Sequence, residues 1–326
     1  MHSTALVYGF YGKKNLGDEL FKLAFQKLFP TVQFKFVDRL LKSDLSNHQV
    51  IIFGGGSFLD GEISSDCSSE LIQLLINKCV MYIGVGIETN INPTHNQLMN
   101  SAKLIATRSV GFKTKFSKME GQYLEIPDIV YALGYNNLSA KSTNKSVLII
   151  PNAELLPRHN SPIWKMAAWE HFKVQMAQFL DELKIQKYSI NFLPMSCNQI
   201  THDLGAAVEI INRMKHGSFD DQLPLDQQVL TNNFTNIMNL ISKYDLIISQ
   251  RLHGSILAHL ANKPCMVLSH HDKLANCIAS DHLPYYEVSK AKLLKSFQDV
   301  KNHIPEPIKM DSFEMLKISV DNLLRI

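Results

Sequence analysis

One stretch of the sequence contains a strand, a polar turn and a helix in succession: Leu246-Ile247-Ile248-Ser249-Gln250-Arg251-Leu252-His253-Gly254-Ser255-Ile256-Leu257-Ala258-His259-Leu260. The apolar run at its start is short and continuous, as expected of a parallel strand buried on both faces. Gly254 and Ser255 then open a helix with apolar residues at helical spacing. The stretch is therefore one strand-and-helix unit of a parallel α/β sheet.

The same alternation continues along the chain, which predicts an α/β fold with parallel sheets. The other predicted strands are residues 5–10, 34–37, 50–53, 79–85, 104–106, 147–150, 188–193 and 265–268. A length of 326 residues favours two domains at ~150 residues each. A polar segment rich in Gly, Asn and Ser places the boundary near residue 142, giving domains 1–142 and 143–326. The tail, residues 311–326, has an apolar helical stripe that must pack on another part of the protein: Phe313, Leu316, Ile318, Val320, Leu323 and Leu324.

Composition excludes several classes of protein. Apolar residues at 45% and charged residues at 19% are typical of a globular chain, and a net charge of +3 predicts no nucleic-acid partner. No apolar run approaches the ~20 residues that cross a bilayer, and no signal peptide is expected at the N-terminus. The five cysteines are scattered without a CxxC pair, so we expect a reducing, cytoplasmic setting.

Residues that directly follow strands deserve most weight, because ligands bind at the carboxyl ends of parallel strands. In the first half, Asn15, Gly17 and Asp18 lie at the start of a predicted helix, where negative charge is favoured. Three glycines and a serine, residues 54–57, predict a row of open amides beside a flat or bulky ligand. Arg108 ends the fifth run.

The second half places Asn152, Ser196 and then Arg251 to Ser255 at strand ends. If the segment after Ser249 is extended, Arg251 and His253 share one face. A guanidinium fork, an imidazole and new helix amides then converge, which suits a phosphate or a carboxylate. These groups predict a ligand cleft between the carboxyl ends of both sheets.

Other kinds of site are not indicated. The glycines match neither the GxGxxG nor the GxxxxGK[ST] spacing, so no nucleotide cofactor is predicted. His253 and His259 lie about 240° apart on a helix, and consecutive side chains in 270–272 point apart, so no metal centre is expected. Three aromatic residues beside the glycine loops either stack on a sugar ring or anchor the loops: Phe10, Tyr11 and Phe58.

The ordered motifs resemble those of the polysaccharide pyruvyl transferases. The resemblance rests on Gly9, Gly12, Asn15 and Gly17-Asp18-Glu19, on residues 54–57, on Arg251-Leu252-His253, and on Lys263-Pro264 with Lys273 beyond. It implies two Rossmann-like domains facing across a cleft, as in GT-B glycosyltransferases, with the C-terminal helix packing back on the first domain. The first domain is implied as the acceptor side and the second as the phosphoenolpyruvate-binding side. It also implies transfer of pyruvate from phosphoenolpyruvate to a sugar, glycan or glycolipid as a ketal, without a cofactor.

The resemblance further implies roles for individual residues. Arg251 and His253 match a donor-binding Arg-x-His motif, and Lys273 matches a basic position after the next strand. His253 is the first candidate for proton transfer and Asp18 the second. Arg108 matches an arginine that the family usually follows with Asp, where this chain has Ser109. The remaining candidate substrate contacts are Asn15, Gly17, Gly55, Gly56, Ser57, Asn152, Ser196, Gly254 and Ser255.

Two other functions are compatible with the same residues. In a GT-B glycosyltransferase, residues 251–253 would grip the diphosphate of a nucleotide sugar. A catalytically silent carbohydrate-binding protein would keep only the scaffold, since fold does not fix activity. If the acceptor is lipid-linked, the protein is expected at the surface of a membrane.

Overall fold

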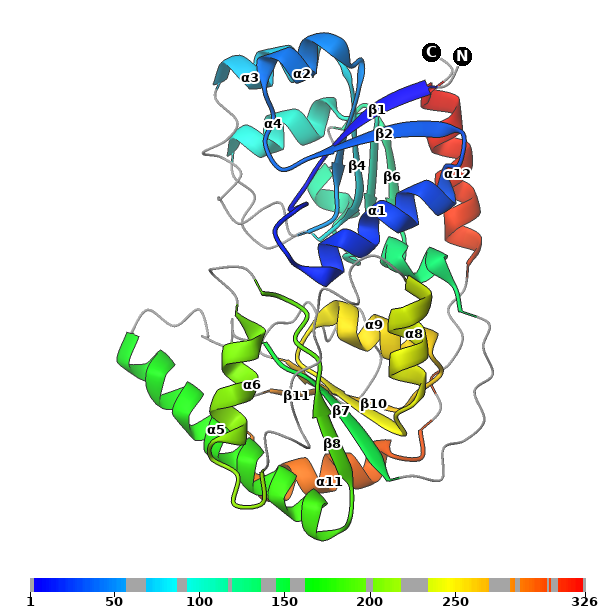
Figure 1. The fold of residues 1–326 in the computed structure, drawn as a ribbon. Coiled ribbons are helices and arrows are strands. Elements are labelled where there is room, and N and C mark those ends of the chain that lie inside the picture. Colours follow the sequence, from blue (N-terminus) through cyan, green and yellow to red (C-terminus); the bar gives the residue numbers. More distant parts are fainter. Residues whose placement is uncertain are drawn as a thin grey trace. The chain divides into compact units, whose positions relative to one another are not determined.

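The computed structural model describes residues 3–56, 69–86, 93–116, 119–135, 145–152, 162–197, 202–217, 234–269, 282–284, 288–303, 305 and 310–324. The chain divides into two compact units (Figure 1). The first unit comprises Met1–Lys13, Asp18–Leu133 and Pro307–Ile326, and the second comprises Lys14–Gly17 and Gly134–Glu306.

The first unit is built on a six-stranded parallel sheet of order β2-β1-β3-β4-β5-β6. Its strands are β1 Ser3–Tyr8, β2 Val32–Val37, β3 Val50–Gly54, β4 Cys79–Val85, β5 Leu104–Thr107 and β6 Gln122–Glu125. Its helices are α1 Leu16–Leu28, α2 Lys42–Asn47, α3 Ser69–Ile76, α4 Pro93–Ser101 and α12 Asp311–Leu324, with the short 3-10 helices η2 Lys113–Phe116 and η3 Ile129–Leu133.

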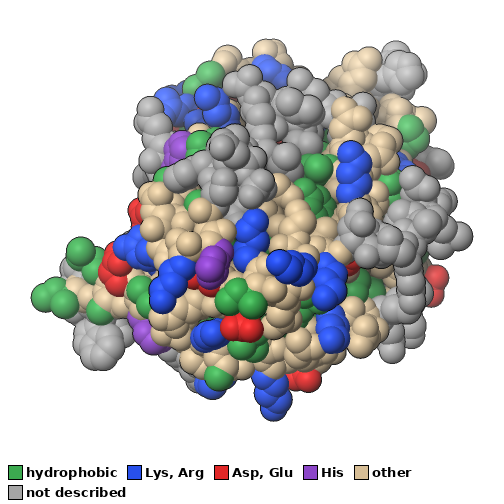
Figure 2. Space-filling view, turned by 60° about the horizontal axis from the view of Figure 1, so that its bottom comes forward, with side chains coloured by type: hydrophobic (Ala, Val, Ile, Leu, Met, Phe, Trp, Pro, Cys, Tyr) green, Lys and Arg blue, Asp and Glu red, His purple; other side chains and the backbone are tan. Residues whose placement is uncertain are grey.

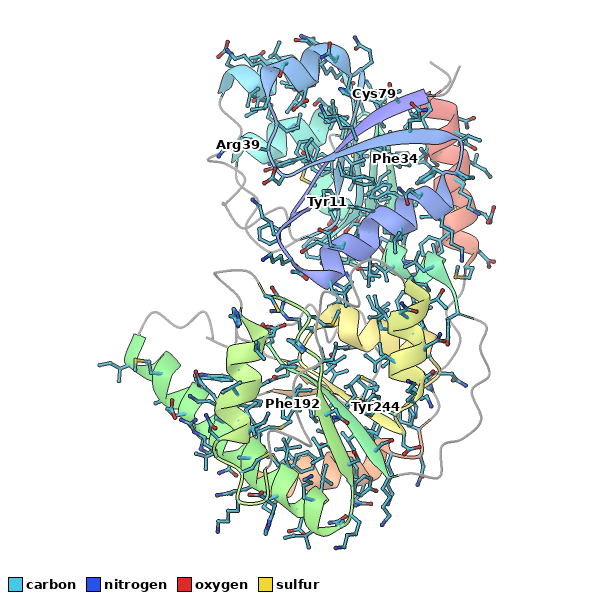
Figure 3. The ribbon with its side chains drawn as sticks, in the orientation of Figure 1. Tyr11, Phe34, Arg39, Cys79, Phe192 and Tyr244 are labelled. Atoms are coloured by element: carbon cyan, nitrogen blue, oxygen red, sulfur yellow. The ribbon has the colours of Figure 1, made fainter. Side chains whose placement is uncertain are left out.

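Helices cover both faces of this sheet (Figure 1). α2, α3 and α4 bury Leu45, Leu75 and Leu98 against one face. On the other face, α12 contacts β5 and β6. Helix α1 packs Phe25 on Phe34 of β2, with ring centroids 5.5 Å apart; Phe34 is labelled in Figure 3. A sheet covered on both faces explains why its central strands are continuous apolar runs.

The second unit has a five-stranded parallel sheet of order β11-β10-β9-β7-β8. Its strands are β7 Ser146–Ile150, β8 Ser189–Phe192, β9 Leu246–Ser249, β10 Cys265–Ser269 and β11 His282–Pro284. Its helices are α5 Pro162–Ile185, α6 Asp203–Ile211, α8 Phe234–Ser242, α9 Leu252–Leu260 and α11 Lys290–Val300. α5, α6 and α11 share one core with the sheet, while α9 contacts β9, β10 and α8.

Both sheets reverse their strand order at an equivalent place. In the first unit the reversal lies between β1 and β3, and in the second between β7 and β9. Ligands of open α/β sheets bind beyond the carboxyl ends of the strands at such a reversal. In the second unit, this rule points to the residues that follow Ile150 and Ser249.

The nine predicted strands are all present among the described residues, with bounds shifted by at most a few positions. The prediction missed β6 and β11, which are short strands at sheet edges. β6 has exposed polar residues at both ends, Gln122 and Glu125, and β11 is only three residues long, so neither produces a continuous apolar run. Figure 2 shows one face of the surface, where Lys and Arg side chains lie among Asp and Glu.

The division between the two units lies earlier in the chain than the expected boundary, whereas the tail helix belongs to the unit on which the resemblance implied that it packs. The division falls between Leu133 and Gly134, before residue 142, which lies outside the described residues. The tail helix α12 groups with the first unit and buries Phe313, Leu316 and Val320. Ile318, which the predicted stripe included, is exposed, because it lies on the opposite side of the helix from those three.

Candidate functional site

The turn between β9 and α9 places Arg251 at the carboxyl edge of the second sheet. Arg251 is extended, with φ −116° and ψ 137°, and directly precedes the helix. The Ser249 hydroxyl accepts from the Arg251 amide at 3.2 Å and donates to the Arg251 carbonyl at 2.8 Å. The helix begins at Leu252, two residues earlier than expected. The prediction that Arg251 and His253 share the face of an extended segment is therefore wrong, because His253 lies in the first helical turn.

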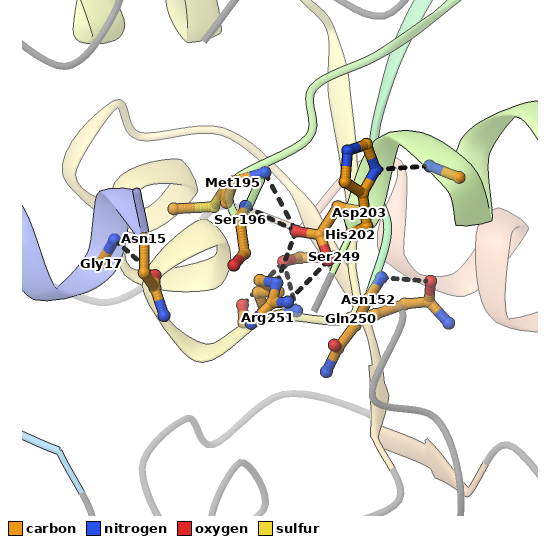
Figure 4. A network of polar contacts seen from close by, with 11 residues as sticks. Asn15, Gly17, Asn152, Met195, Ser196, His202, Asp203, Ser249, Gln250 and Arg251 are labelled. Carbon is orange, nitrogen blue, oxygen red and sulfur yellow. Dashed lines mark hydrogen bonds and ion pairs between the residues drawn. The ribbon is translucent and has the colours of Figure 1, made fainter. Parts of the chain in front are cut away.

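The Arg251 guanidinium binds the Asp203 carboxylate through two parallel hydrogen bonds (Figure 4). Nε donates to Oδ2 at 2.7 Å and Nη2 donates to Oδ1 at 2.6 Å. Oδ2 also accepts from the backbone amides of Met195 and Ser196, at 3.1 and 2.8 Å. The Asp203 side chain is completely buried. The carboxylate accepts four hydrogen bonds, two from backbone amides and two from the Arg251 cation, which donates one to each oxygen. The buried negative charge is therefore well compensated.

Sequence reasoning missed Asp203. It occupies the first position of α6, where an acidic residue ordinarily complements the helix dipole and attracts no further attention. Only the pairing with an arginine 48 residues away distinguishes it.

Segment Lys14–Gly17 lies beside the loop that follows β8. Leu16 N–H donates to the Met195 carbonyl at 2.8 Å, Cys197 N–H donates to the Lys14 carbonyl at 3.0 Å, and Asn15 and Ser196 form an antiparallel bridge. The Asn15 side-chain oxygen accepts from Gly17 N–H at 3.1 Å (Figure 4). These contacts fix the start of α1 within the second unit.

Gly17 makes room for the imidazole of His253. A Cβ atom at Gly17 would lie 2.1 Å from His253 Nδ1, which is far inside van der Waals contact. The glycine at this position is therefore required by the histidine ring. It brings the predicted residues Gly17 and His253 into direct contact.

The first turn of α9 carries no side-chain cap, because Arg251 at the N-cap position makes no capping hydrogen bond. The first amides of a helix lack intrahelical acceptors and favour negative charge. Next to this turn, the Asn152 amide donates to Gln250 Oε1 at 3.1 Å, across the ends of β7 and β9. Gln250 is buried, and its Nε2 has no acceptor among the described residues. Sequence reasoning did not single out Gln250.

Known proteins resemble this chain both in sequence and in fold. A family model described as polysaccharide pyruvyl transferase matches residues 15–272, more than half of the chain. The chain belongs to the polysaccharide pyruvyl transferase family. The matched segment contains Asn15, Gly17, Asp203, Arg251 and His253. Among curated proteins, no relative matches significantly.

Solved structures resemble the fold at low sequence identity. A UDP co-structure of MnaA from S. aureus has a TM-score of 0.58 at 10% identity, covering 100% of this chain and 97% of that one. The UDP-GlcNAc 2-epimerase of Methanocaldococcus jannaschii in complex with UDP-GlcNAc and UDP has a TM-score of 0.53 at 12% identity, covering 98% of this chain and 99% of that one. The UDP-GlcNAc 2-epimerase of Neisseria meningitidis bound to UDP-GlcNAc has a TM-score of 0.50 at 13% identity, covering 98% of this chain and 99% of that one. The expected α/β, GT-B-like fold class is confirmed.

Several glycines at the strand ends of the first unit, Gly84 of β4 among them, have a packing role in this pyruvyl transferase family member. A Cβ at Gly55 or Gly84 would collide with Phe21, and one at Gly54 would collide with Val7, Phe25 and the Tyr11 hydroxyl. The Gly55 amide already donates to the Ile83 carbonyl at 3.1 Å. The interpretation of these glycines as clearance for a ligand is thus corrected for Gly54 and Gly55, whose space is filled by the protein's own side chains.

Tyr11 anchors its loop. Its ring is buried, and its hydroxyl donates to the Gly54 carbonyl at 2.7 Å. Burial raises the pKa of the Tyr11 phenol well above its usual value, and the carboxylates of Asp18 and Glu19 add to the rise. Of the other two aromatic candidates, Phe10 is exposed and Phe58 lies outside the described residues.

The remaining predicted residues of the first unit have internal partners. Arg108 forms a buried ion pair with Asp128, just before η3, at 2.6 Å. A carboxylate partner for Arg108 is thus present, although Ser109 replaces the expected Asp. Asp18 is buried in the first turn of α1. Glu19 accepts from the Gly12 amide at 2.7 Å and pairs with Lys22, so its role is to hold the loop before α1.

Gly254 and Ser255 also serve the fold. A Cβ at Gly254 would lie 2.4 Å from the Ser249 hydroxyl and 2.8 Å from Ile150, so glycine lets α9 approach the sheet. The buried Ser255 hydroxyl donates to the Arg251 carbonyl at 3.1 Å. The Ser255 hydroxyl thus closes the first turn of α9, and the contact of Ser255 with a ligand stays a prediction. Gly56 precedes Ser57, which lies outside the described residues together with Lys273.

The described part of the chain contains neither a metal-binding cluster nor a membrane-spanning helix. No three His, Cys, Asp or Glu side chains there are arranged to hold a metal ion, and no helix there has the length and apolar character needed to cross a bilayer.

Burial raises the pKa of the Cys265 thiol to about 12, which leaves it protonated and a poor nucleophile near neutral pH.

Proposed function

We propose that this family member transfers pyruvate from phosphoenolpyruvate to two hydroxyl groups of a sugar or glycan, as a ketal, without a metal ion or cofactor. One observation carries the proposal. The first turn of α9, for which Arg251 provides no side-chain cap, and the fixed guanidinium of Arg251 form an anion-binding arrangement at the strand-order reversal of the second sheet.

The donor has two anionic groups, a phosphate and a carboxylate. The α9 amides suit one of them, and the outer Nη1/Nη2 edge of Arg251 suits the other. Because Asp203 neutralises the guanidinium charge, a further cation is needed to balance the donor. We assign that role to Lys273, because Arg108 is itself paired with a buried carboxylate.

The reaction balances without a redox step. One acceptor oxygen bonds to carbon 2 of the donor, the bond from that carbon to the phosphate oxygen breaks, and a second acceptor oxygen closes the ketal. Of the two hydroxyl protons released, one ends on the methylene carbon, which becomes a methyl group, and the other ends on the departing phosphate. A histidine titrates near neutrality and is suited to carry such protons. His253 is the first candidate, and Asp18, in the first turn of α1, is the second.

The other proposed acceptor and donor contacts are residues at the predicted strand ends: Asn15, Gly17, Gly56, Ser57, Asn152 and Ser196. We place the reaction in the cytoplasm, where phosphoenolpyruvate is made, and at a membrane surface if the acceptor is lipid-linked.

Titration calorimetry followed by an activity screen tests the proposal. We expect phosphoenolpyruvate to bind, and we expect a panel of sugars and glycosides to include one that releases phosphate from it. The product should be heavier than the acceptor by the mass of pyruvic acid minus that of one water molecule. Binding of a nucleotide sugar without phosphoenolpyruvate would favour a glycosyltransferase instead, and binding of sugar alone would favour a silent carbohydrate-binding protein.

A further inference from the structure

Asp203 joins three parts of the second unit through one buried carboxylate. It begins α6, accepts from the amides of Met195 and Ser196 in the loop after β8, and pairs with Arg251 after β9. Its own amide donates to the Ser196 carbonyl at 2.9 Å. Ser196 in turn bridges to Asn15. The carboxylate therefore fixes both the guanidinium and the loop beside Asn15.

The edge of the guanidinium that Asp203 occupies determines which edge remains for a ligand. An arginine has two edges that can each form a pair of parallel hydrogen bonds, one through Nε and one Nη, the other through both Nη atoms. Asp203 takes the Nε and Nη2 edge. Nη1 has no acceptor among the residues that the structure describes. The second edge is thus held in a set direction and is available to an oxyanion.

A long side chain without this partner would lose that direction. An arginine side chain has many rotamers and loses much conformational entropy when it is fixed, and Arg251 makes no other side-chain hydrogen bond within the described ranges. The two short bonds to a fully buried, rigidly held carboxylate remove that freedom before any ligand arrives. Preorganisation of this kind is worth most when the ligand must be oriented for reaction.

We propose that Asp203 is a positioning residue, which aims the Nη1/Nη2 edge of Arg251 at an anionic group of the donor. The proposal rests on the proposed function only in identifying that anion with the phosphate or carboxylate of phosphoenolpyruvate. The residue acts through Arg251 and does not itself touch the substrate.

The test uses Asp203→Asn with Asp181→Asn as a matched control. In Asp203→Asn, the remaining side-chain oxygen can still accept from the Met195 and Ser196 amides and from Arg251 Nε, but the new NH₂ group would face Nη2. The guanidinium therefore loses its Nη2 bond and the opposite charge, and with them the fixed direction of its second edge. Asp181 is also buried and also accepts from two consecutive amides, those of Lys215 and His216 at 2.9 and 2.8 Å, but no arginine is among its partners. Both variants lose a buried carboxylate, and only Asp203→Asn changes Arg251.

We expect Asp203→Asn to lower kcat/KM for phosphoenolpyruvate on the order of 100-fold, the usual cost of a misplacement of about 1 Å. Asp181→Asn should stay within about twofold of the native value at a temperature where both are folded. If Asp203 acts through Arg251, the double variant with Arg251→Lys should be no slower than Arg251→Lys alone. Full additivity of the two losses would overturn the proposal and leave Asp203 a structural residue.

A second readout separates this proposal from the proposed function. The side-chain Nε–H signal of Arg251 in a ¹⁵N-arginine spectrum, assigned by its loss in Arg251→Lys, should respond to inorganic phosphate in the native protein and much less in Asp203→Asn. Equal responses in both proteins would overturn the positioning role. A native protein whose Arg251 responds to phosphate but which releases none from phosphoenolpyruvate would refute the proposed function while retaining the role of Asp203.

Discussion

Replacing Gly17 with alanine provides the sharpest test of the site, because the structure leaves no space for the added methyl group. The new Cβ would lie 2.1 Å from His253 Nδ1 and 2.8 and 2.9 Å from Cγ and Cε1 of the same ring. Ordinary contact begins at 3.4 Å, so the ring must withdraw by roughly 1.3 Å, and such a shift can cost about 100-fold in rate. The start of α1 cannot move away easily, since Leu16 and Asn15 are bonded to the loop after β8.

The protein should stay folded while it loses activity. Alanine is favoured over glycine in a helix by about 1 kcal/mol, which offsets part of an overpacking cost of about 1–3 kcal/mol. We therefore expect kcat for phosphate release to fall on the order of 100-fold, with a small change in the free energy of unfolding measured in urea.

Gly205→Ala is the matched control. Gly205 also lies in the first turn of a helix, α6, with a histidine Nδ1 as its nearest neighbour, but His202 is 3.9 Å from the position of the Cβ. This variant should keep native kinetics. In a His253→Asn background, Gly17→Ala should cause no additional loss. A folded Gly17→Ala protein with native kcat would refute the assignment of His253 to the reaction.

Four further outcomes are expected. His253→Ala should lower turnover about 10²–10⁴-fold, and His253→Asn should retain donor binding while being nearly as slow; a native kcat with only a raised KM would make His253 a binding residue. Arg251→Lys should impair the donor step despite its kept charge, because a point charge replaces a planar fork, and wild-type steady-state kinetics would remove Arg251 from the site. Tyr11→Phe should lose about 1 kcal/mol in urea unfolding near neutral pH, since the bond to Gly54 is removed. Because the folded-state pKa of Tyr11 is raised above 10.0, the native protein loses stability as the pH rises past that value, and the Phe variant should lose less over the same range; identical pH slopes would contradict this. Addition of EDTA should leave turnover unchanged, whereas a loss restored by a divalent cation would show a metal requirement.

Much of the fold could be predicted because it is encoded locally. The runs that form β4 and β9 are apolar from end to end, which is a property of a few neighbouring residues and indicates a strand covered on both faces. The same reasoning placed Arg251 and His253 at a strand end, and the order of the motifs indicated the family. It failed where local pattern is weak, as in β6, and where helix onset depends on packing, as at Leu252.

The partners of the site residues depend on tertiary structure alone. The sheet order β9-β7-β8 places the loops after β8 and β9 on either side of one strand, and this arrangement brings Asp203 to Arg251. Gly17 meets His253 only because the start of α1 pairs with the loop after β8. Glycines at strand ends likewise have the same local sequence signature whether their space holds a ligand or, as at Gly55, a phenylalanine of the same unit. Local sequence determines which residues reach the sheet edge, whereas the contacts that give them a role join segments far apart in the chain and form only when the sheet assembles.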